Sequence, residues 1–231
     1  MKIAYLTMAY DLEKAYSVAI PNCVDQTGNY NKVLYLMYQQ PFPPHIGNNH
    51  DLPIEIKEYN VEGIVGGGWW LMKLKRFLEV CTETHLVWWD EDDYRLSDYT
   101  TKALSVLTAQ SAVAWNLWNY EVKRGSIIKR QYGSGMGTLV MRVDALRQPV
   151  DELLDRWPDG QLRIDENRKQ VDRHHVGNWT HAGGALDAYL KRVLKVRYHV
   201  VEHDGVRFMT YHSKTNTHGG RDPKENVDYG G

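Results

Sequence analysis

The stretch HLVWWDEDDYRL, residues 85–96, joins a short apolar run to four consecutive carboxylates. Leu86–Trp89 has the length and composition of a buried strand, and Asp90–Asp93 follow it without a break. Adjacent carboxylates repel one another unless a cation offsets their charge. Mg²⁺ and Mn²⁺ prefer such hard oxygen ligands. The stretch therefore predicts a strand that ends in a site for a divalent metal carrying a diphosphate. The alternative is a solvated acidic turn that caps the next helix.

Strand-like and helix-like segments alternate through the first hundred residues. Apolar or alternating runs predict strands, and helical spacing after a cap such as Asp11 predicts helices. This alternation is typical of βαβ units in a mostly parallel sheet, whose ligands bind at the carboxyl ends of the strands. The predicted strands are Ile3–Thr7, Val33–Tyr38, Ile54–Tyr59 and Leu86–Trp89; the predicted helices are Leu12–Ile20, which Pro21 kinks or ends, Leu71–Thr82, and a segment from Ser97 or Asp98 to about Gln110.

The second half of the chain predicts a different arrangement. A β-hairpin is expected to join Val113–Glu121 to Ser126–Gln131, and a second hairpin is expected to turn at Asp204–Gly205. Pro149 is expected to interrupt the helix that Asp144 starts. The other predicted elements are the strand Thr138–Val143, a short helix Val150–Trp157, an amphipathic helix Ala182–Val196, and the hairpin strands Arg197–His203 and Val206–His212.

The composition is that of an ordinary globular α/β protein. The chain has 231 residues, 42% of them hydrophobic and 25% charged, and a net charge of -1, which excludes strong attraction of the whole molecule to nucleic acid. Two cysteines argue against a disulfide framework and favour a reducing cytoplasm. No apolar run is long enough to span a membrane, so a cytoplasmic protein without membrane insertion is expected. Eight Trp and fifteen Tyr suit either a core or a surface that stacks on sugars or bases.

Four segments occur in an order that is more specific than any one of them. They are YLTMAYD (5–11), VDQTGNYNKVLYLMY (24–38), VGGGWWLMKLKRFLEV (65–80) and HLVWWDEDD (85–93). In this order the chain resembles the GT-A glycosyltransferases, in particular the family 2 type of nucleotide-sugar transferases. The resemblance implies an α/β, Rossmann-like fold: a mostly parallel sheet flanked by helices, with a small additional β-hairpin region.

The resemblance also implies how the chain is divided. A single catalytic domain would cover residues 1–212, with a nucleotide-sugar-binding half at 1–110 and an acceptor-binding half at 111–212. The polar segment 213–231 is expected to be a flexible tail.

The resemblance implies that residues at the strand ends bind the nucleotide-sugar donor. Tyr10 would stack on the base, and Asp11 would accept hydrogen bonds from the base or ribose, unless it only caps the helix. Gln39 stands where the family often has an acidic residue that contacts the base, which leaves the nucleotide open. The basic residues of 73–76 would contact phosphate or form a solvated helix face. The implied donor-binding residues are Thr7, Ala9, Tyr10, Asp11, Gln39, Gly67, Lys75, Arg76, Asp90, Glu91 and Met136.

The resemblance further implies a metal and a catalytic base. Asp92 would be the main ligand of Mn²⁺ or Mg²⁺ in a D-x-D motif, and His212 would be a further ligand, with His218 as its competitor. Asp187, in the segment GGALDAYLKR, would remove the proton from an acceptor hydroxyl. The alternative for Asp187 is a surface ion pair with Lys191 at i+4. A well-placed Asp187 predicts inversion at the anomeric carbon, whereas a purely structural Asp187 would allow a retaining mechanism.

Other functions remain open at this stage. An aromatic-rich module could bind glycan or nucleic acid without catalysis. A nucleotidyltransferase would share the sheet and the carboxylates, but the segment TMAYDLEKAY lacks the Gly-rich basic loop expected after the first strand. A nuclease of the DEDD type would draw its carboxylates from separate motifs. The acceptor is expected to bear a hydroxyl and to be a polysaccharide or a hydroxylated base in DNA. Basic residues within 163–173 and 191–197 could line the path of such a polymer or form ordinary solvated helix faces.

Overall fold

The computed structural model describes residues 1–9, 12–38, 52–61, 69–91, 93–107, 113–123, 126–131, 139–156, 158 and 199–210. Within these residues, nine strands form one sheet.

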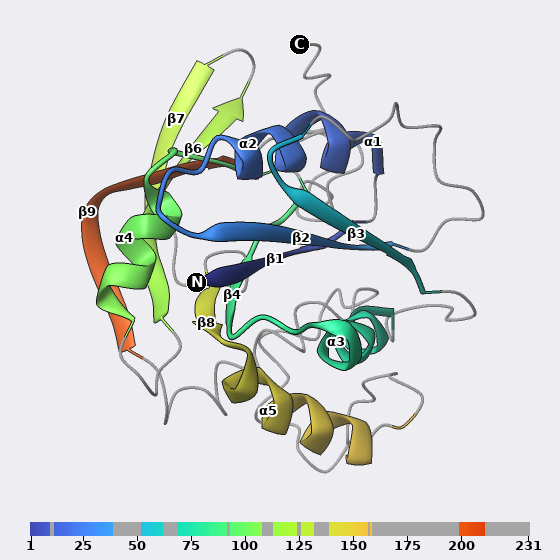
Figure 1. Cartoon of the computed structure of the whole chain (residues 1–231). Helices are drawn as coiled ribbons and strands as arrows, with labels where there is room; N and C mark the ends of the chain where they lie inside the picture. The colour runs from blue at the N-terminus through green and yellow to red at the C-terminus, as the bar shows by residue number, and fades with distance from the viewer. Residues whose placement is uncertain are drawn as a thin grey trace, which may run out of the picture.

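The predicted parallel half of the sheet is confirmed. It consists of β1 (Lys2–Met8), β2 (Asn31–Tyr38), β3 (Glu55–Asn60) and β4 (His85–Trp88), in the order β3-β2-β1-β4 (Figure 1). Each neighbouring pair is parallel. β1 and β2 are buried along almost their whole length, as the near-continuous apolar runs of parallel strands require. Their carboxyl ends therefore meet at one edge of the sheet.

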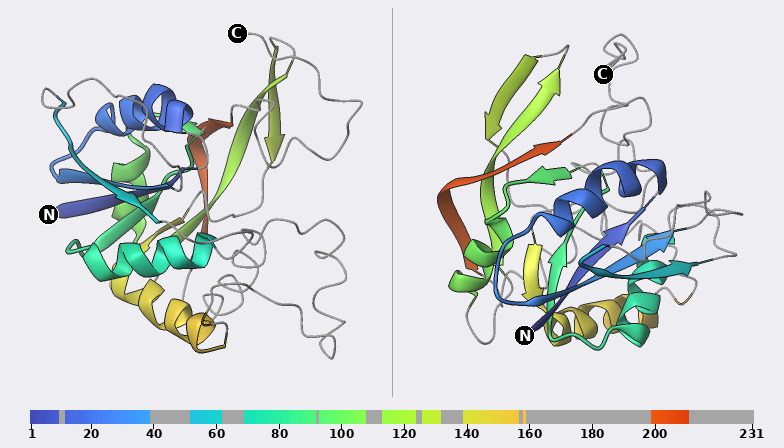
Figure 2. Two further views of the ribbon diagram at one scale, coloured as in Figure 1. Left: turned by 90° about the vertical axis from the view of Figure 1, so that its right-hand side faces the viewer. Right: turned by 45° about the horizontal axis from the view of Figure 1, so that its top comes forward.

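Antiparallel strands extend the sheet beyond β4. β8 (Leu139–Arg142) pairs antiparallel with β4, and β6 (Val113–Lys123) pairs antiparallel with β8. β9 (His199–Thr210) runs parallel to β6, and β5 (Asp93–Arg95) closes the order as the antiparallel neighbour of β9. β7 (Ser126–Gln131) forms the predicted hairpin with β6, which projects from the rest of the sheet in both views of Figure 2.

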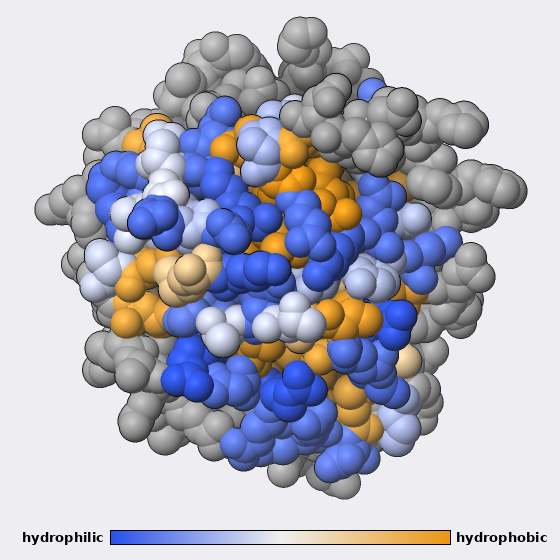
Figure 3. Space-filling view, viewed as in Figure 1, coloured by the Kyte–Doolittle hydropathy of each residue, from blue (hydrophilic) through white to orange (hydrophobic). Residues whose placement is uncertain are grey.

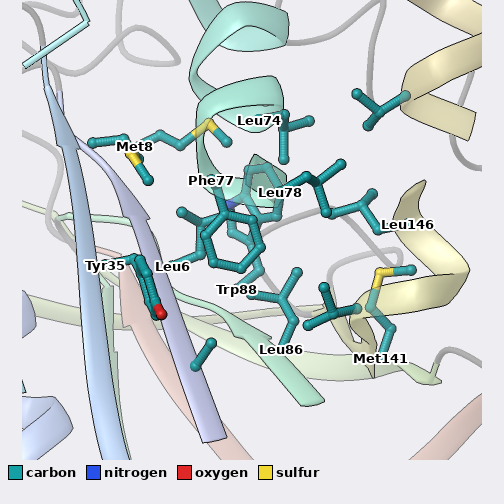
Figure 4. Close-up of a cluster of buried hydrophobic side chains, with 14 of the residues drawn as sticks. Leu6, Met8, Tyr35, Leu74, Phe77, Leu78, Leu86, Trp88, Met141 and Leu146 are labelled. Carbon is teal, nitrogen blue, oxygen red and sulfur yellow. The ribbon is translucent and has the colours of Figure 1, made fainter. Parts of the chain in front are cut away.

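Helices cover both faces of the sheet. α3 (Trp69–Val80) and α5 (Val143–Arg156) lie on one face, while α1 (Leu12–Lys14), η1 (Ala15–Ala19), α2 (Ile20–Val24) and α4 (Tyr99–Val106) lie on the other (Figure 1). On the first face, Phe77 and Leu78 of α3 pack around Trp88 of β4, together with Leu146 of α5 (Figure 4). On the second face, Trp89 and Tyr99 pack with Tyr5 of β1.

The surface seen in Figure 3 is mostly hydrophilic, with smaller apolar areas between. Among the residues that the structure describes, Met1, Leu52 and Leu96 are the large apolar side chains that are exposed. No helix in the described part of the chain is both long enough and apolar enough to cross a bilayer.

Pro21 and Pro149 do not end the helices in which they occur. α1, η1 and α2 follow one another without a gap, and the Ile20 N–H donates to the Ala15 oxygen, which is the i→i−5 bond of a π turn. Pro21 follows this π turn inside the continuous helical segment, and the wider turn accommodates a residue that has no N–H to donate. The predicted break at Pro149 is wrong, because α5 runs continuously through it. Leu146, Val150 and Leu153 on both sides of the proline are fully buried, and this burial outweighs the local cost of proline.

The predicted hairpin at Asp204–Gly205 is also wrong. β9 is one strand that pairs with β6 on both sides of this dipeptide. Asn116 pairs with Glu202 and Trp118 pairs with Arg207, so that residues 203–206 stand opposite Leu117 alone. A bulge of this kind absorbs extra residues while the strand continues. The turn-forming dipeptide therefore makes an irregularity within a strand instead of a reversal.

Candidate functional site

The candidate site lies where the carboxyl ends of β1, β2 and β4 meet. Hydrogen bonds between main-chain atoms continue past the ends of the strands. The Trp89 N–H donates to Leu6 over 2.9 Å, the Ala9 N–H donates to Met37 over 2.8 Å, and the Val61 N–H donates to Tyr38 over 2.8 Å. The segments that leave the strands are thus held side by side, which is the usual position of a ligand site in an open α/β sheet.

The two tryptophans before the acidic turn serve opposite faces of the sheet. We use "acidic turn" for residues 90–93 throughout. Trp88 packs in the cluster under α3 and α5, and Trp89 packs in the cluster under α2 and α4. Both are completely buried, and the alternation of side chains along a strand explains their opposite directions. The acidic turn therefore begins at the end of a strand whose last side chains are packed in both core layers.

Asp90 and Glu91 begin the acidic turn and are half-buried. The Trp88 indole N–H donates to Oδ1 of Asp90 over 3.0 Å. Asp93 belongs to β5, and its partner in the sheet is Thr210, the last described residue of β9. The far end of β9 therefore lies beside the acidic turn.

Arg95 connects the acidic turn to the core layer under α2 and α4. Its side chain is fully buried, and Nη1 donates to the Trp88 main-chain oxygen over 2.6 Å. The guanidinium lies 4.3 Å from the ring centroid of Trp89 and 4.8 Å from that of Tyr99. Asn22 of α2 accepts from the Arg95 N–H over 2.7 Å and donates to the Arg95 oxygen over 2.8 Å. A buried cation is tolerated where hydrogen bonds and aromatic faces replace water.

Lys73 is the basic residue of α3 that reaches the strand ends. Its side chain is only 1% exposed, and Nζ donates to the Ala9 main-chain oxygen over 2.8 Å. Burial lowers the pKa of the Lys73 amine from 10.5 to about 7, and the nearby charge of Glu91 opposes part of that shift. An amine with this pKa gains a proton readily when an anion arrives beside it.

The two basic residues predicted to bind the donor, Lys75 and Arg76, lie on the outer side of α3. Lys75 is exposed, and Arg76 forms an exposed ion pair with Glu79 at 3.2 Å and lies over the Tyr59 ring. One sequence signal favoured Lys73: it precedes Phe77 by four residues, which places it on the buried face of α3.

Thr7 and Ala9 are both buried at the end of β1. The polar groups of Ala9 are both on its main chain. Its N–H donates to the Met37 oxygen in β2, and its oxygen accepts from Lys73. Within the described part of the chain, Thr7 Oγ1 and the indole nitrogen of Trp89 are buried without a hydrogen-bond partner.

The remaining predicted site residues lie outside the described residues: Tyr10, Asp11, Gln39, Gly67, Asp92, Met136, Asp187 and His212. Three of them adjoin the site directly in the chain, since Tyr10 follows Ala9, Gln39 follows Tyr38, and Asp92 stands between Glu91 and Asp93. Among the residues that the structure describes, no group of three or more His, Cys, Asp or Glu side chains could hold a metal ion. The two described carboxylates of the acidic turn, Asp90 and Glu91, are oxygen donors of the kind that suits Mg²⁺ or Mn²⁺.

Comparison with solved structures identifies the fold. S. aureus TarS 1-349, solved in complex with UDP-GlcNAc, matches with a TM-score of 0.55 and 12% identity over 94% of this chain and 60% of that chain. The glycosyltransferase GlyE of Streptococcus pneumoniae TIGR4 matches with a TM-score of 0.51 and 13% identity over 87% of this chain and 45% of that chain. The chain thus spans less than two thirds of the length of these proteins. No protein-family model and no curated protein sequence matches it. The chain has the GT-A-type fold of these glycosyltransferases, as the sequence predicted.

Proposed function

We propose that the chain is a metal-dependent glycosyltransferase that moves a sugar from a nucleoside-diphosphate sugar to an acceptor hydroxyl. The observation that carries this proposal is that Lys73 donates to the main chain at the end of β1, near enough to the acidic turn after β4 for the charge of Glu91 to affect its pKa. A cation and a run of carboxylates at this edge of the sheet suit a diphosphate that is bridged by a divalent metal. The shared fold supports the same class of reaction.

The donor would lie across the ends of β1 and β2. Tyr10 and Asp11 come two and three residues after β1 and Gln39 follows β2 directly, so we assign these three side chains to the base and ribose. Lys73 supplies a positive charge for the diphosphate. TarS, which shares the fold, was solved with UDP and with UDP-GlcNAc; uridine nucleotides are therefore the first donors to test.

A metal would be held by Asp92, with His212 as a further ligand. Thr210 pairs with Asp93, and two further residues of extended chain span at most about 7 Å, so His212 is within reach of the acidic turn. When bound, Mn²⁺ or Mg²⁺ would act as a Lewis acid that offsets the charge developing on the leaving diphosphate. The carboxylates of the acidic turn would hold this ion and orient the donor sugar.

The chain's own residues would supply the remaining chemistry. Asp187 would take the proton from the acceptor hydroxyl, and the oxygen would attack the anomeric carbon from the face opposite the diphosphate, which inverts that carbon. The acceptor is a polysaccharide or a hydroxylated base in DNA, drawn along the basic residues of 163–173 and 191–197. Salt-dependent weakening of polymer binding on neutralising these residues is the expected sign of such a path.

Calorimetry with a panel of nucleoside-diphosphate sugars tests the proposal. Each donor is titrated with and without Mn²⁺ into the wild type, Asp92→Asn, and Asp151→Asn, a control on the exposed side of α5. One donor should bind only with Mn²⁺, Asp92→Asn should lose it, and Asp151→Asn should keep it. Absence of binding to the wild type under every condition would refute the proposal.

The competing function is an aromatic-rich module that binds glycan or nucleic acid without catalysis. Binding by such a module would survive removal of the metal and substitution of Asp92. Donor hydrolysis or transfer by the wild type, abolished in Asp187→Asn with donor affinity retained, would exclude the module.

A further inference from the structure

Trp88 connects the start of the acidic turn to both core layers, through its side chain and through its main chain. On one side, the Trp88 indole N–H donates to the Asp90 carboxylate over 3.0 Å. On the other side, the Trp88 main-chain oxygen accepts from Nη1 of Arg95 over 2.6 Å. The first contact fixes a side chain at the start of the turn, and the second joins the strand before the turn to the strand after it.

Trp88 cannot easily move to follow a displaced carboxylate. Its ring is completely buried among Phe77, Leu78 and Leu86 (Figure 4). Rotation of a side chain in such close-packed surroundings would open a void and force neighbouring residues out of place. A hydrogen bond from an N–H that is fixed in this way restricts the direction of the half-buried Asp90 carboxylate, and a bond to a charged acceptor is stronger than one between neutral groups.

Arg95 limits the movement of the main chain in the same region. The guanidinium is enclosed by the rings of Trp89 and Tyr99, and both main-chain groups of Arg95 are bonded to Asn22. The two ends of the segment 88–95 are therefore bridged by one buried side chain. The turn between them carries the four consecutive carboxylates of residues 90–93.

We propose that Trp88 is a positioning residue, whose indole N–H orients the Asp90 carboxylate toward the donor nucleotide. This inference rests on the proposed function, because it assigns a purpose to the contact only if the acidic turn binds a nucleoside diphosphate. The contact is specific to this residue: among the described residues, the neighbouring Trp89 indole nitrogen has no hydrogen-bond partner, although Trp89 is equally buried.

The two tryptophans provide a matched pair of variants. Trp88→Phe and Trp89→Phe each shorten a fully buried aromatic side chain in adjacent positions, but only the first removes an N–H that donates to Asp90. Binding is measured by calorimetry at saturating Mn²⁺ with whichever of UDP, GDP, ADP, CDP and dTDP binds the wild type most tightly. Trp88→Phe should weaken binding about tenfold, the effect of losing a hydrogen bond to a charged group. Trp89→Phe keeps an aromatic ring beside the Arg95 guanidinium and should change binding less than about twofold.

A double-mutant cycle separates positioning from a general effect on the fold. In the Asp90→Ala background, Trp88→Phe should have little further effect on binding, because the carboxylate through which it acts is already absent. Equal weakening by Trp88→Phe in both backgrounds, or equal effects of Trp88→Phe and Trp89→Phe, would overturn the inference and leave the proposed function intact. Failure of the wild type to bind any of the five diphosphates would remove the proposed function, and this inference with it.

A measurement on the wild type covers the case in which Trp88→Phe does not fold. The indole N–H resonances of Trp88 and Trp89 are followed by NMR during titration with Mg²⁺ and the same diphosphate. The Trp88 resonance should shift more than the Trp89 resonance, since its acceptor contacts the ligand. A Trp88 resonance that stays in place while the diphosphate binds would overturn the inference.

Discussion

Lys73 joins α3 to the carboxyl end of β1 through a hydrogen bond of 2.8 Å from its Nζ atom to the Ala9 oxygen. This bond places an amine at the point where the chain enters the segment expected to hold the donor nucleotide. Lys73→Met should therefore weaken binding of a nucleoside diphosphate by about tenfold to a hundredfold, since hydrogen bonds to charged groups contribute roughly 1.5–3 kcal/mol. Calorimetry with Mn²⁺ present measures the effect.

Lys32 supplies the control for this prediction. Its Nζ atom also donates to a main-chain oxygen, that of Val24, over 2.6 Å, and burial also lowers its pKa. Lys32 lies near the start of β2, however, at the opposite end of the strand from the candidate site. Lys32→Met should leave diphosphate binding unchanged. Equal losses in both variants would show that Lys73 affects the fold and not the ligand.

The lowered pKa of Lys73 predicts that donor binding depends on pH. With a pKa of about 7 the free amine loses its proton as the pH rises through neutrality, whereas a bound diphosphate favours the protonated form. Wild-type affinity should therefore fall between about pH 7 and pH 9 relative to the affinity of Lys73→Met at each pH. A wild-type to variant ratio that is constant across this range would contradict a titrating role for Lys73.

The same pKa shift predicts the pH dependence of stability. The folded protein releases the Lys73 proton near pH 7 and the unfolded chain near pH 10.5, so the unfolded chain binds more protons between these values. The contribution of Lys73 therefore destabilises the fold at low pH, and the free energy of unfolding rises with pH by at most about 1.4 kcal/mol per unit in this window. Urea denaturation of the wild type and Lys73→Met at several pH values measures the slope, which should be smaller in the variant.

Asn22 should contribute strongly to stability through Arg95. Asn22→Ala removes both hydrogen bonds to the main chain of Arg95 and leaves a buried N–H and a buried carbonyl without these partners. The expected loss is about 3 kcal/mol of unfolding free energy. Asn29→Ala, in the exposed turn before β2, should cost less than about 0.5 kcal/mol. A similar small loss in Asn22→Ala would show that water replaces the amide.

The sequence predicted the parallel half of the fold because local pattern and tertiary packing agree there. Strands such as Val33–Tyr38 are apolar throughout, and a strand buried on both faces has no competing local preference. The position of the acidic turn at the end of β4 followed from the abrupt change after Trp89. These two features place the candidate site at the edge of the sheet where the carboxyl ends of β1, β2 and β4 meet.

The features that the sequence did not predict depend on contacts between distant residues. The dipeptide Asp204–Gly205 favours a turn locally, but pairing with β6 on both sides keeps β9 extended. Which basic side chain of α3 reaches the strand ends, Lys73 or Lys75, depends on the face of the helix that the sheet covers. Lysine is usually exposed, so its residue type alone does not predict that Lys73 is buried. The hydrogen bond from Asn22 to the Arg95 main chain joins residues far apart in the chain, and no local sequence pattern predicts it.

Pro149 offers a direct test of the continuous helix α5. The proline cannot donate to the residue four positions earlier, Ala145, and its ring crowds that turn. Because α5 is helical on both sides of it, Pro149→Ala should restore a hydrogen bond and raise the free energy of unfolding by about 1–3 kcal/mol, less the entropy that proline removes from the unfolded chain. Gln148→Ala, at the neighbouring position, should change stability by less than about 0.5 kcal/mol. Thermal and urea denaturation measure both variants. A loss of stability in Pro149→Ala would mean that the proline favours a break in the helix, as its sequence alone predicts.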